Sequence, residues 1–197
     1  MLDLKKIAED LKIKYEVVCE VGVWKPEESH IKNLIPHAKK VMMFEAQEKY
    51  AELSRIAFKE YNYVTVYTVA IYKENLDNIK LIDVGSSSSI QGIASPSTYV
   101  AAYNLPQREV FYVKARTFDN YDEGDIDILT CDIEGAEWFV LEKMKSRPSL
   151  ICLETHYQPY GYINPFMSEI NNWMKNNSYV KHCNDASDTI YKKIDKL

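Results

Sequence analysis

The stretch CDIEGAEWFVLEKM, residues 131–144, places three carboxylates between two apolar segments of the chain. The preceding residues, DIDILT, have the pattern of a buried strand, and the residues after the acids predict a helix over 136–145. Asp132, Glu134 and Glu137 therefore stand where a buried strand ends and a helix begins. In an open α/β sheet, ligands bind beyond the carboxyl ends of the strands, so this stretch predicts both the fold and a functional site.

Strand-like runs alternate with helical patterns along most of the sequence. Helices are predicted over 2–12, 26–38, 48–61, 136–145 and 165–176, and strands over 15–22, 40–46, 63–72, 126–131 and 150–155. The segment 79–118 is strand-like but irregular, and the end of the chain predicts two strands joined by a polar turn. This alternation predicts an α/β fold with a mostly parallel central sheet, helices on both faces and a C-terminal antiparallel hairpin. We expect a single domain over 1–197, with an N-terminal helix within 1–13.

Composition and charge limit the classes of partner. The chain has 197 residues, enough for one domain with a sizeable core, and its net charge of −5 argues against a nucleic-acid-binding surface. No apolar run reaches the ~20 residues that span a bilayer, so no membrane partner is expected. The cysteines form no CxxC pair, and the N-terminus lacks the apolar region of a signal peptide. These features favour a cytoplasmic location.

Acidic residues follow four of the predicted strands. Glu20 and Gly22 close the first strand, Glu45 ends the second, and Glu154 comes shortly before His156 at the end of the strand over 150–155. Because the carboxyl ends of parallel strands meet at one edge of a sheet, we expect these acids to converge there with the acids of residues 131–144. An acid-x-Gly turn followed by an acid at the end of the second strand is typical of sites that bind a nucleoside cofactor through its ribose diol.

The loop after the first strand favours S-adenosylmethionine over a dinucleotide. This loop, GVWKPEES, has one glycine and two acids. A dinucleotide needs a glycine-rich turn where its pyrophosphate approaches a helix N-terminus, and acids repel a pyrophosphate. The methionyl end of S-adenosylmethionine carries an ammonium group, which acids do not repel. An NAD-linked oxidoreductase is therefore the less favoured alternative.

Taken in order, these motifs resemble the FkbM family of S-adenosylmethionine-dependent methyltransferases. The run LTCDIEGAEWFVLEKM resembles its D-x-E-G-x-E signature, CEVGVW its D-V-G-A-N turn, and MFEAQEKYAEL its F-E-P segment with the following helix. YTVAIY, ARTFDNY and LICLETH are similar to further family segments, so the resemblance covers roughly residues 15–180. Glu20 stands in place of Asp, Trp24-Lys25-Pro26 replaces the Asn-x-Gly portion, and Ala46 replaces the usual Pro.

The resemblance implies a class I Rossmann-like methyltransferase fold with S-adenosylmethionine as cofactor. It places the cofactor on residues around the strand ends: Glu20, Gly22, Trp24, Glu45, Ala46, Ala70 and Asp132. Asp132 is the expected general base for an acceptor hydroxyl. His156 is the other candidate, because an imidazole pKa near ~6.5 suits a base at neutral pH. Glu134 is expected to assist catalysis by orienting the acceptor or holding a cation.

The acceptor is expected to contact residues of the signature and of the segment after the strand over 150–155: Glu137, Glu154, Tyr157 and Tyr160. Structural alternatives stay open, with Glu137 as a helix cap or a solvent-exposed acid, His156 as a core histidine and the tyrosines as parts of an ordinary loop. The run GSSSSI, residues 85–90, is more typical of a hairpin turn than of a phosphate-binding nest. A divalent metal held by the clustered carboxylates Asp132, Glu134 and Glu154 is a further option, although no dedicated ligand spacing is present.

The resulting functional expectation is O-methyl transfer to a small hydroxylated acceptor, a carbohydrate in the first instance, with no nucleic acid as partner. The alternative is a non-catalytic Rossmann-like module that binds a nucleoside or a protein partner, which the altered glycine turn motivates. The oligomeric state is left open, with a homodimer as one option.

Overall fold

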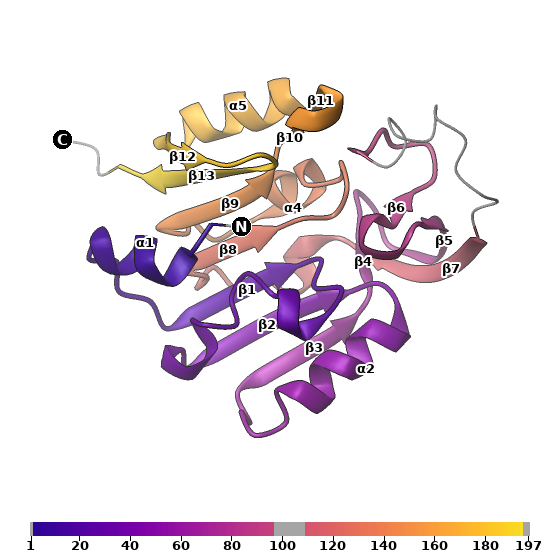
Figure 1. The fold of residues 1–197 in the computed structure, drawn as a ribbon, viewed down its shortest axis with the longest axis horizontal. Helices are drawn as coiled ribbons and strands as arrows, with labels where there is room; N and C mark the ends of the chain where they lie inside the picture. The colour runs from indigo at the N-terminus through magenta and orange to yellow at the C-terminus, as the bar shows by residue number, and fades with distance from the viewer. Residues whose placement is uncertain (1, 97–108, 195–197) are drawn as a thin grey trace.

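The computed structural model describes residues 2–96 and 109–194, and its centre is a seven-stranded sheet of order β12-β13-β9-β8-β1-β2-β3 (Figure 1). Its strands are β1 (Val17–Val21), β2 (Lys40–Glu45), β3 (Val64–Thr68), β8 (Ile128–Cys131), β9 (Leu150–Glu154), β12 (Tyr179–Asn184) and β13 (Asp188–Lys193). Neighbouring strands from β3 to β9 pair in parallel, while β13 is antiparallel to β9 and to β12. The predicted Rossmann-like α/β fold with a C-terminal antiparallel hairpin is confirmed.

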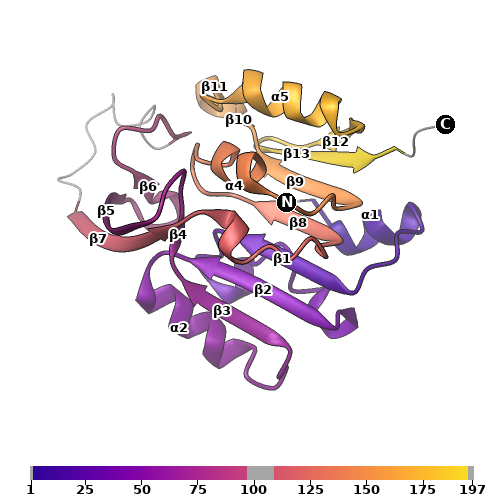
Figure 2. The ribbon, with the colours of Figure 1, turned by 180° about the vertical axis from the view of Figure 1, so that it is seen from behind.

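Helices cover both faces of this sheet, as Figures 1 and 2 show from opposite sides. The helix α1 (Leu4–Asp10) packs through Leu4 and Ala8 on one face. The other face carries α4 (Trp138–Lys143) and α5 (Met167–Asn176), while α2 (Glu48–Ala57) lies along β2 and β3. None of the helices in the described part of the chain is long and apolar enough to cross a membrane.

A second, four-stranded sheet of order β4-β7-β5-β6 flanks the carboxyl edge of the main sheet. It comprises β4 (Ala70–Ile71), β5 (Leu76–Asp83), β6 (Ser89–Ile90) and β7 (Glu109–Arg116). The prediction of one continuous strand over 63–72 is therefore wrong, because β3 and β4 belong to different sheets. β2 ends at Glu45, opposite Thr68, so the chain beyond Thr68 loses its partner and turns to pair with β7. The middle segment over 96–104, ambiguous in the sequence, lies outside the described residues from residue 97 onward.

The predicted helix over 26–38 is also wrong. In its place are two short 3₁₀ helices, η1 (Pro26–Glu28) and η2 (Ile35–His37). The buried carboxylate of Glu20 accepts hydrogen bonds from Ser29 Oγ at 2.5 Å and from the His30 amide at 2.7 Å. These bonds hold Ser29 in an extended conformation, with ψ 129°, which ends the first helical turn.

The order of the strands reverses at β1, whose neighbours are β2 on one side and β8 on the other. Gly22 follows β1 with φ +88°, and its amide donates to the Phe44 carbonyl. A Cβ atom at Gly22 would lie 1.8 Å from the carbonyl oxygen of Asp132. Only glycine therefore allows the loops after β1 and β8 to meet at this point.

We expect Gly22→Ala to reduce the free energy of unfolding by about 2–4 kcal/mol, because it adds a backbone clash to the strain of a positive φ. Gly124→Ala is the matched control, since Gly124 has φ +92° and no atom within 4 Å of the added Cβ. The control should lose only about 1 kcal/mol. Urea unfolding measures both, and equal losses would show that the contact with the Asp132 loop is unimportant.

Glu20→Gln tests whether the buried carboxyl on β1 is uncharged in the folded protein. Burial raises the pKa of Glu20 to about 8, so the folded state keeps a proton that the unfolded chain releases near pH ~4.5. Folding stability is therefore lost as the pH rises from about 5 to about 8. The glutamine variant should gain about 1.4 kcal/mol relative to wild type for each pH unit in this window. A stability difference that does not change with pH, measured by urea unfolding in metal-free buffer, would contradict the assignment.

Candidate active site

A cavity of about 430 Å³ opens where β1, β2 and β8 end, between the two sheets. Its lining includes residues that the sequence assigned to cofactor binding or catalysis: Gly22, Trp24, Glu45, Ala46, Ala70, Asp132 and Glu134. Its apolar wall combines Phe44 of the main sheet with Ile71, Leu81 and Ile90 of the small sheet. The carboxyl edge of the sheet thus brings together side chains that are far apart in the sequence.

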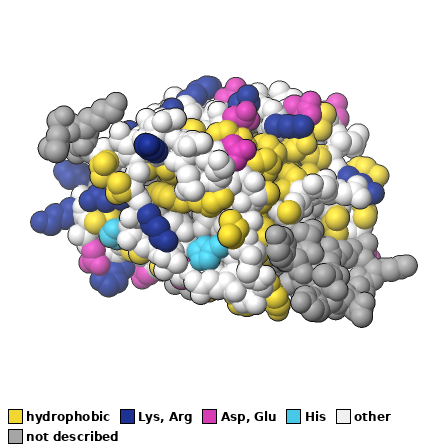
Figure 3. Space-filling view, turned by 90° about the horizontal axis from the view of Figure 1, so that it is seen from above, with side chains coloured by type: hydrophobic (Ala, Val, Ile, Leu, Met, Phe, Trp, Pro, Cys, Tyr) yellow, Lys and Arg dark blue, Asp and Glu magenta, His cyan; other side chains and the backbone are white. Residues whose placement is uncertain are grey.

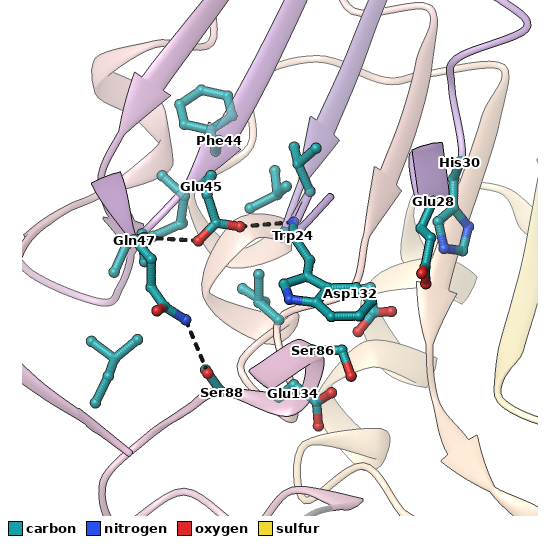
Figure 4. A pocket seen from close by; sticks show the side chains of 18 of the residues that line it. Trp24, Glu28, His30, Phe44, Glu45, Gln47, Ser86, Ser88, Asp132 and Glu134 are labelled. Atoms are coloured by element: carbon teal, nitrogen blue, oxygen red, sulfur yellow. Dashed lines mark hydrogen bonds between the residues drawn. The ribbon is translucent and has the colours of Figure 1, made fainter. Parts of the chain in front are cut away.

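Glu45 is held at the pocket wall by backbone amides (Figure 4). Its Oε2 accepts from the Trp24 amide at 2.8 Å, and its Oε1 accepts from the Gln47 amide at 2.7 Å. Burial raises the pKa of Glu45, while these amide hydrogen bonds act in the opposite direction. The backbone amides of Val23, Trp24, Ala46 and Gln47 all surround this carboxyl, so its orientation is fixed at the cavity wall.

Trp24 places a large side chain inside the cavity. Its φ of 51° is left-handed, a conformation that asparagine or glycine adopts more readily. Figure 4 shows the indole among the side chains that line the cavity, and its buried Nε1 has no hydrogen-bond partner among the described residues. The Tyr50 ring meets the indole edge-on, with the two ring centroids 6.1 Å apart, and the Lys25 ammonium lies 4.4 Å from the centroid of the indole.

Several pocket residues were not predicted from the sequence as ligand contacts. Gln47 donates from Nε2 to Ser88 Oγ at 3.0 Å, which links the start of α2 to the turn between β5 and β6. The GSSSSI run is a hairpin turn, as favoured, yet its Ser86 and Ser88 also line the cavity. Asp188 and His30 line the opposite side. The polar turn before β13 was the only sequence signal for Asp188, and it gave no indication that the turn folds back over the pocket.

A layer of acidic side chains closes the inner end of the cavity. Glu154 of β9 pairs in register with Asp188 of β13, and Asp132 follows β8 at the same level. Glu134 reaches the same place from the next loop, with φ 58°. One carboxylate oxygen from each of Asp132, Glu134 and Glu154 lies within 4.8 Å of the other two. The separation of adjacent parallel strands, about 4.8 Å, accounts for the approach of Asp132 to Glu154, and the loop after β8 adds Glu134.

These carboxyls have shifted pKa values because burial opposes their ionisation. Burial raises the pKa of Asp132 to about 6. Burial and then the charge of Asp132 raise the pKa of Glu134 to about 9, that of Asp188 to about 7, and that of Glu154 well above its ordinary value. Within residues 2–96 and 109–194, no lysine or arginine forms an ion pair with any of the four.

Glu137 lies inside the protein and does not line the cavity. Its Oε1 accepts from the Ile133 amide at 2.8 Å and from the Gly135 amide at 3.3 Å, and its Oε2 accepts from the side-chain amide of Asn164. Burial raises the pKa of Glu137 to about 7. These contacts hold the D-x-E-G-x-E loop in shape and tie it to the start of α5. Glu137 stands at the N-cap position of α4, but its side chain is fully buried and caps no amide of that helix.

His156 and the two tyrosines also lie outside the cavity lining. The Nε2 of His156 lies 3.1 Å from the Asp185 carbonyl, and its Nδ1 lies 2.8 Å from Thr155 Oγ1. Because a carbonyl only accepts, Nε2 carries the proton and Nδ1 accepts from the threonine. Tyr157 and Tyr160 stack on each other with ring centroids 5.4 Å apart, on the hairpin of β10 (His156–Tyr157) and β11 (Tyr162–Ile163).

The hairpin of β10 and β11 contributes to the outer surface. Tyr160 and Ile163 are both largely exposed. Viewed from above in Figure 3, the molecule carries a band of hydrophobic side chains between groups of charged ones. Glu20 and Glu154, by contrast, lie behind the cavity wall, so neither touches the open space directly.

Comparison with known proteins supports one family. No curated protein matches the chain. The structure of a SAM-dependent methyltransferase from Aquifex aeolicus matches with a TM-score of 0.50 and 10% identity, covering 95% of this chain and 87% of that one. Magnesium protoporphyrin IX methyltransferase from Synechocystis PCC 6803, solved with bound SAM, matches with a TM-score of 0.50 and 10% identity, covering 96% and 76%. These likenesses support the fold.

The family is assigned from the sequence. The model of the methyltransferase FkbM domain matches residues 20–181, which include the strand ends, the acidic signature and α5. The chain therefore belongs to the FkbM methyltransferase domain family, a family of S-adenosylmethionine-dependent methyltransferases.

Proposed function

We propose that this protein transfers a methyl group from S-adenosylmethionine to a hydroxyl of a small acceptor, a sugar or glycan precursor. The observation that carries the proposal is the joint position of Glu45 and Asp132 on one cavity, at the point where the strand order reverses. In α/β sheets this is where nucleoside cofactors bind.

The residues present fit the cofactor. Glu45 lines the cavity at the end of β2, where it would accept from the ribose hydroxyls, and the apolar wall near Phe44 and Ile71 suits an adenine ring. Asp132, with a pKa of about 6, is mostly ionised at neutral pH and gives the inner end of the cavity a negative potential, which suits the ammonium and sulfonium charges. Gly22 and Trp24 would border the bound nucleoside, and Ala46 and Ala70 leave room beside it.

The cofactor supplies an activated methyl group, and the chain must position the acceptor and take its proton. Asp132 is the proposed base. Its raised pKa of about 6 makes it a stronger base than an ordinary aspartate, yet leaves it mostly ionised at neutral pH. We assign this role to Asp132 rather than to His156, because both ring nitrogens of the histidine are engaged in hydrogen bonds outside the cavity lining.

The polar rim of the cavity supports a hydroxylated acceptor. Ser86, Ser187 and Glu28 line it and offer both donors and acceptors, which a sugar requires. Tyr157 and Tyr160 lie outside the cavity lining, so they would contact only an acceptor that extends beyond the cavity. A cytoplasmic location and a non-nucleic-acid acceptor belong to the same proposal.

A non-catalytic module is the second candidate, and one observation favours it. Trp24 stands at the position of the family's asparagine, and its indole takes up space inside the cavity. A chain that had lost cofactor binding would tolerate such a replacement.

Calorimetric titration separates these candidates. We expect S-adenosylhomocysteine to bind wild-type protein, and Glu45→Gln to weaken binding about tenfold, because the amide nitrogen cannot accept from a ribose hydroxyl. Glu74→Gln, at an exposed acid that does not line the cavity, is the control and should bind as wild type does. No binding of either S-adenosylmethionine or S-adenosylhomocysteine to wild type would favour the non-catalytic module.

Asp132→Asn tests the base. Transfer of radiolabelled methyl groups to a panel of monosaccharides and nucleotide sugars should fall by 10²-fold or more, since the amide cannot take a proton. Affinity for S-adenosylhomocysteine should stay within about threefold of wild type. An equal loss of turnover and cofactor affinity would instead assign Asp132 to the cofactor site.

A further inference from the structure

Two side chains of the acidic layer each have a buried carboxylate oxygen without a hydrogen-bond partner. Glu134 and Glu154 are each only 6% exposed, and the Oε2 atom of each has no hydrogen-bond partner among the described residues. An unpaired buried oxygen costs free energy, so native proteins pair such atoms with protein, water or an ion. Both atoms belong to side chains that meet Asp132 within 4.8 Å. The arrangement therefore calls for a donor or a positive charge between them.

The charged groups around the acidic layer do not supply this donor or positive charge. The groups that face the layer from β13 and from the D-x-E-G-x-E loop are the further acids Asp188 and Glu137, and Glu20 lies behind it on β1. His30 also lies close to this edge, on the side of Asp188. Glu137 is already satisfied by two amides and Asn164. The carboxylate oxygens that still lack a hydrogen-bond partner thus belong to Glu134 and Glu154, next to Asp132.

We propose that Asp132, Glu134 and Glu154 bind a hard divalent cation, of the Mg²⁺, Mn²⁺ or Ca²⁺ class. Three carboxylates from two adjacent strand ends and one loop form an all-oxygen set, which these ions prefer over softer metals. Metal–oxygen bonds of ~2.0–2.6 Å place ligand oxygens ~3–5 Å apart around one ion. The separation of at most 4.8 Å among the three oxygens fits this range.

The cation would also define the acceptor more closely. Three protein ligands leave positions open on an ion that takes six or more, and Asp132 and Glu134 border the open cavity. Resting on the proposed function, the open positions would take two neighbouring hydroxyls of the acceptor, a vicinal diol. Coordination lowers the pKa of a bound hydroxyl, which eases loss of its proton to a nearby base.

Titration with Mn²⁺ tests the site without cofactor or acceptor. The full chain is freed of metal with EDTA, dialysed and titrated calorimetrically at neutral pH, with Mg²⁺ and Ca²⁺ in parallel. We expect one Mn²⁺ per chain, with at least tenfold weaker binding in each of Glu134→Gln and Glu154→Gln. Glu142→Gln, which changes an exposed acid on α4, is the matched control and should bind Mn²⁺ as wild type does.

The outcomes are distinct. No Mn²⁺ binding by wild type, or the same affinity in all three variants, would overturn the site and leave a layer of protonated carboxyls. Circular dichroism confirms that each variant is folded, and the two ligand variants give independent tests. The same samples are titrated with S-adenosylhomocysteine in EDTA. Binding of S-adenosylhomocysteine without binding of Mn²⁺ would contradict the cation site and leave the proposed function standing. Binding of Mn²⁺ without any methyl transfer would contradict the proposed function and leave the cation site standing.

Discussion

The site depends on one electrostatic constraint: carboxylates gather at a sheet edge where no lysine or arginine of the described part of the chain forms an ion pair with them. Parallel strands end together, and the register of β8, β9 and β13 sets Asp132, Glu154 and Asp188 side by side. Two ionised carboxylates ~5 Å apart repel by roughly 3 kcal/mol even at an effective dielectric constant of ~20. The folded protein must therefore hold protons there or bind positive charge. These acids therefore favour a positively charged ligand in this part of the pocket, and protons neutralise them when none is bound.

Much of this could be predicted from the sequence, because the informative residues are local. Apolar runs ending in an acid identify strand ends, and strand ends in an α/β chain share an edge, so Glu45 and Asp132 could be placed on one cavity without coordinates. The reason for glycine at position 22 is different. Its positive φ suggests only a turn, whereas the clash with the Asp132 carbonyl depends on how two distant loops pack.

What the sequence could not predict are roles fixed by distant partners. The segment over 26–38 has the pattern of a helix start, but the Glu20 carboxylate takes the Ser29 hydroxyl and the His30 amide and ends the turn. His156 has the chemistry of a base, yet the Asp185 carbonyl and Thr155 engage both of its nitrogens. Side chains able to serve as bases are identified from composition, and whether they are free to act is decided by tertiary hydrogen bonds.

The cofactor, the base and the cation make related demands on Asp132, and the three can be reconciled. A carboxylate that coordinates a cation is a weaker base than a free one, but the cation makes the acceptor hydroxyl more acidic by a larger amount. A weak base is then sufficient to take the proton of this hydroxyl. The oxygen of Asp132 that does not contact the ion remains available for it. Glu134 and Glu154 carry the remaining charge, so a positively charged cofactor and a divalent ion can occupy neighbouring parts of one acidic cavity. Under the proposed function, Trp24 occupies part of the cavity, while Asp132 and Glu134 supply the acidic groups that catalysis would use.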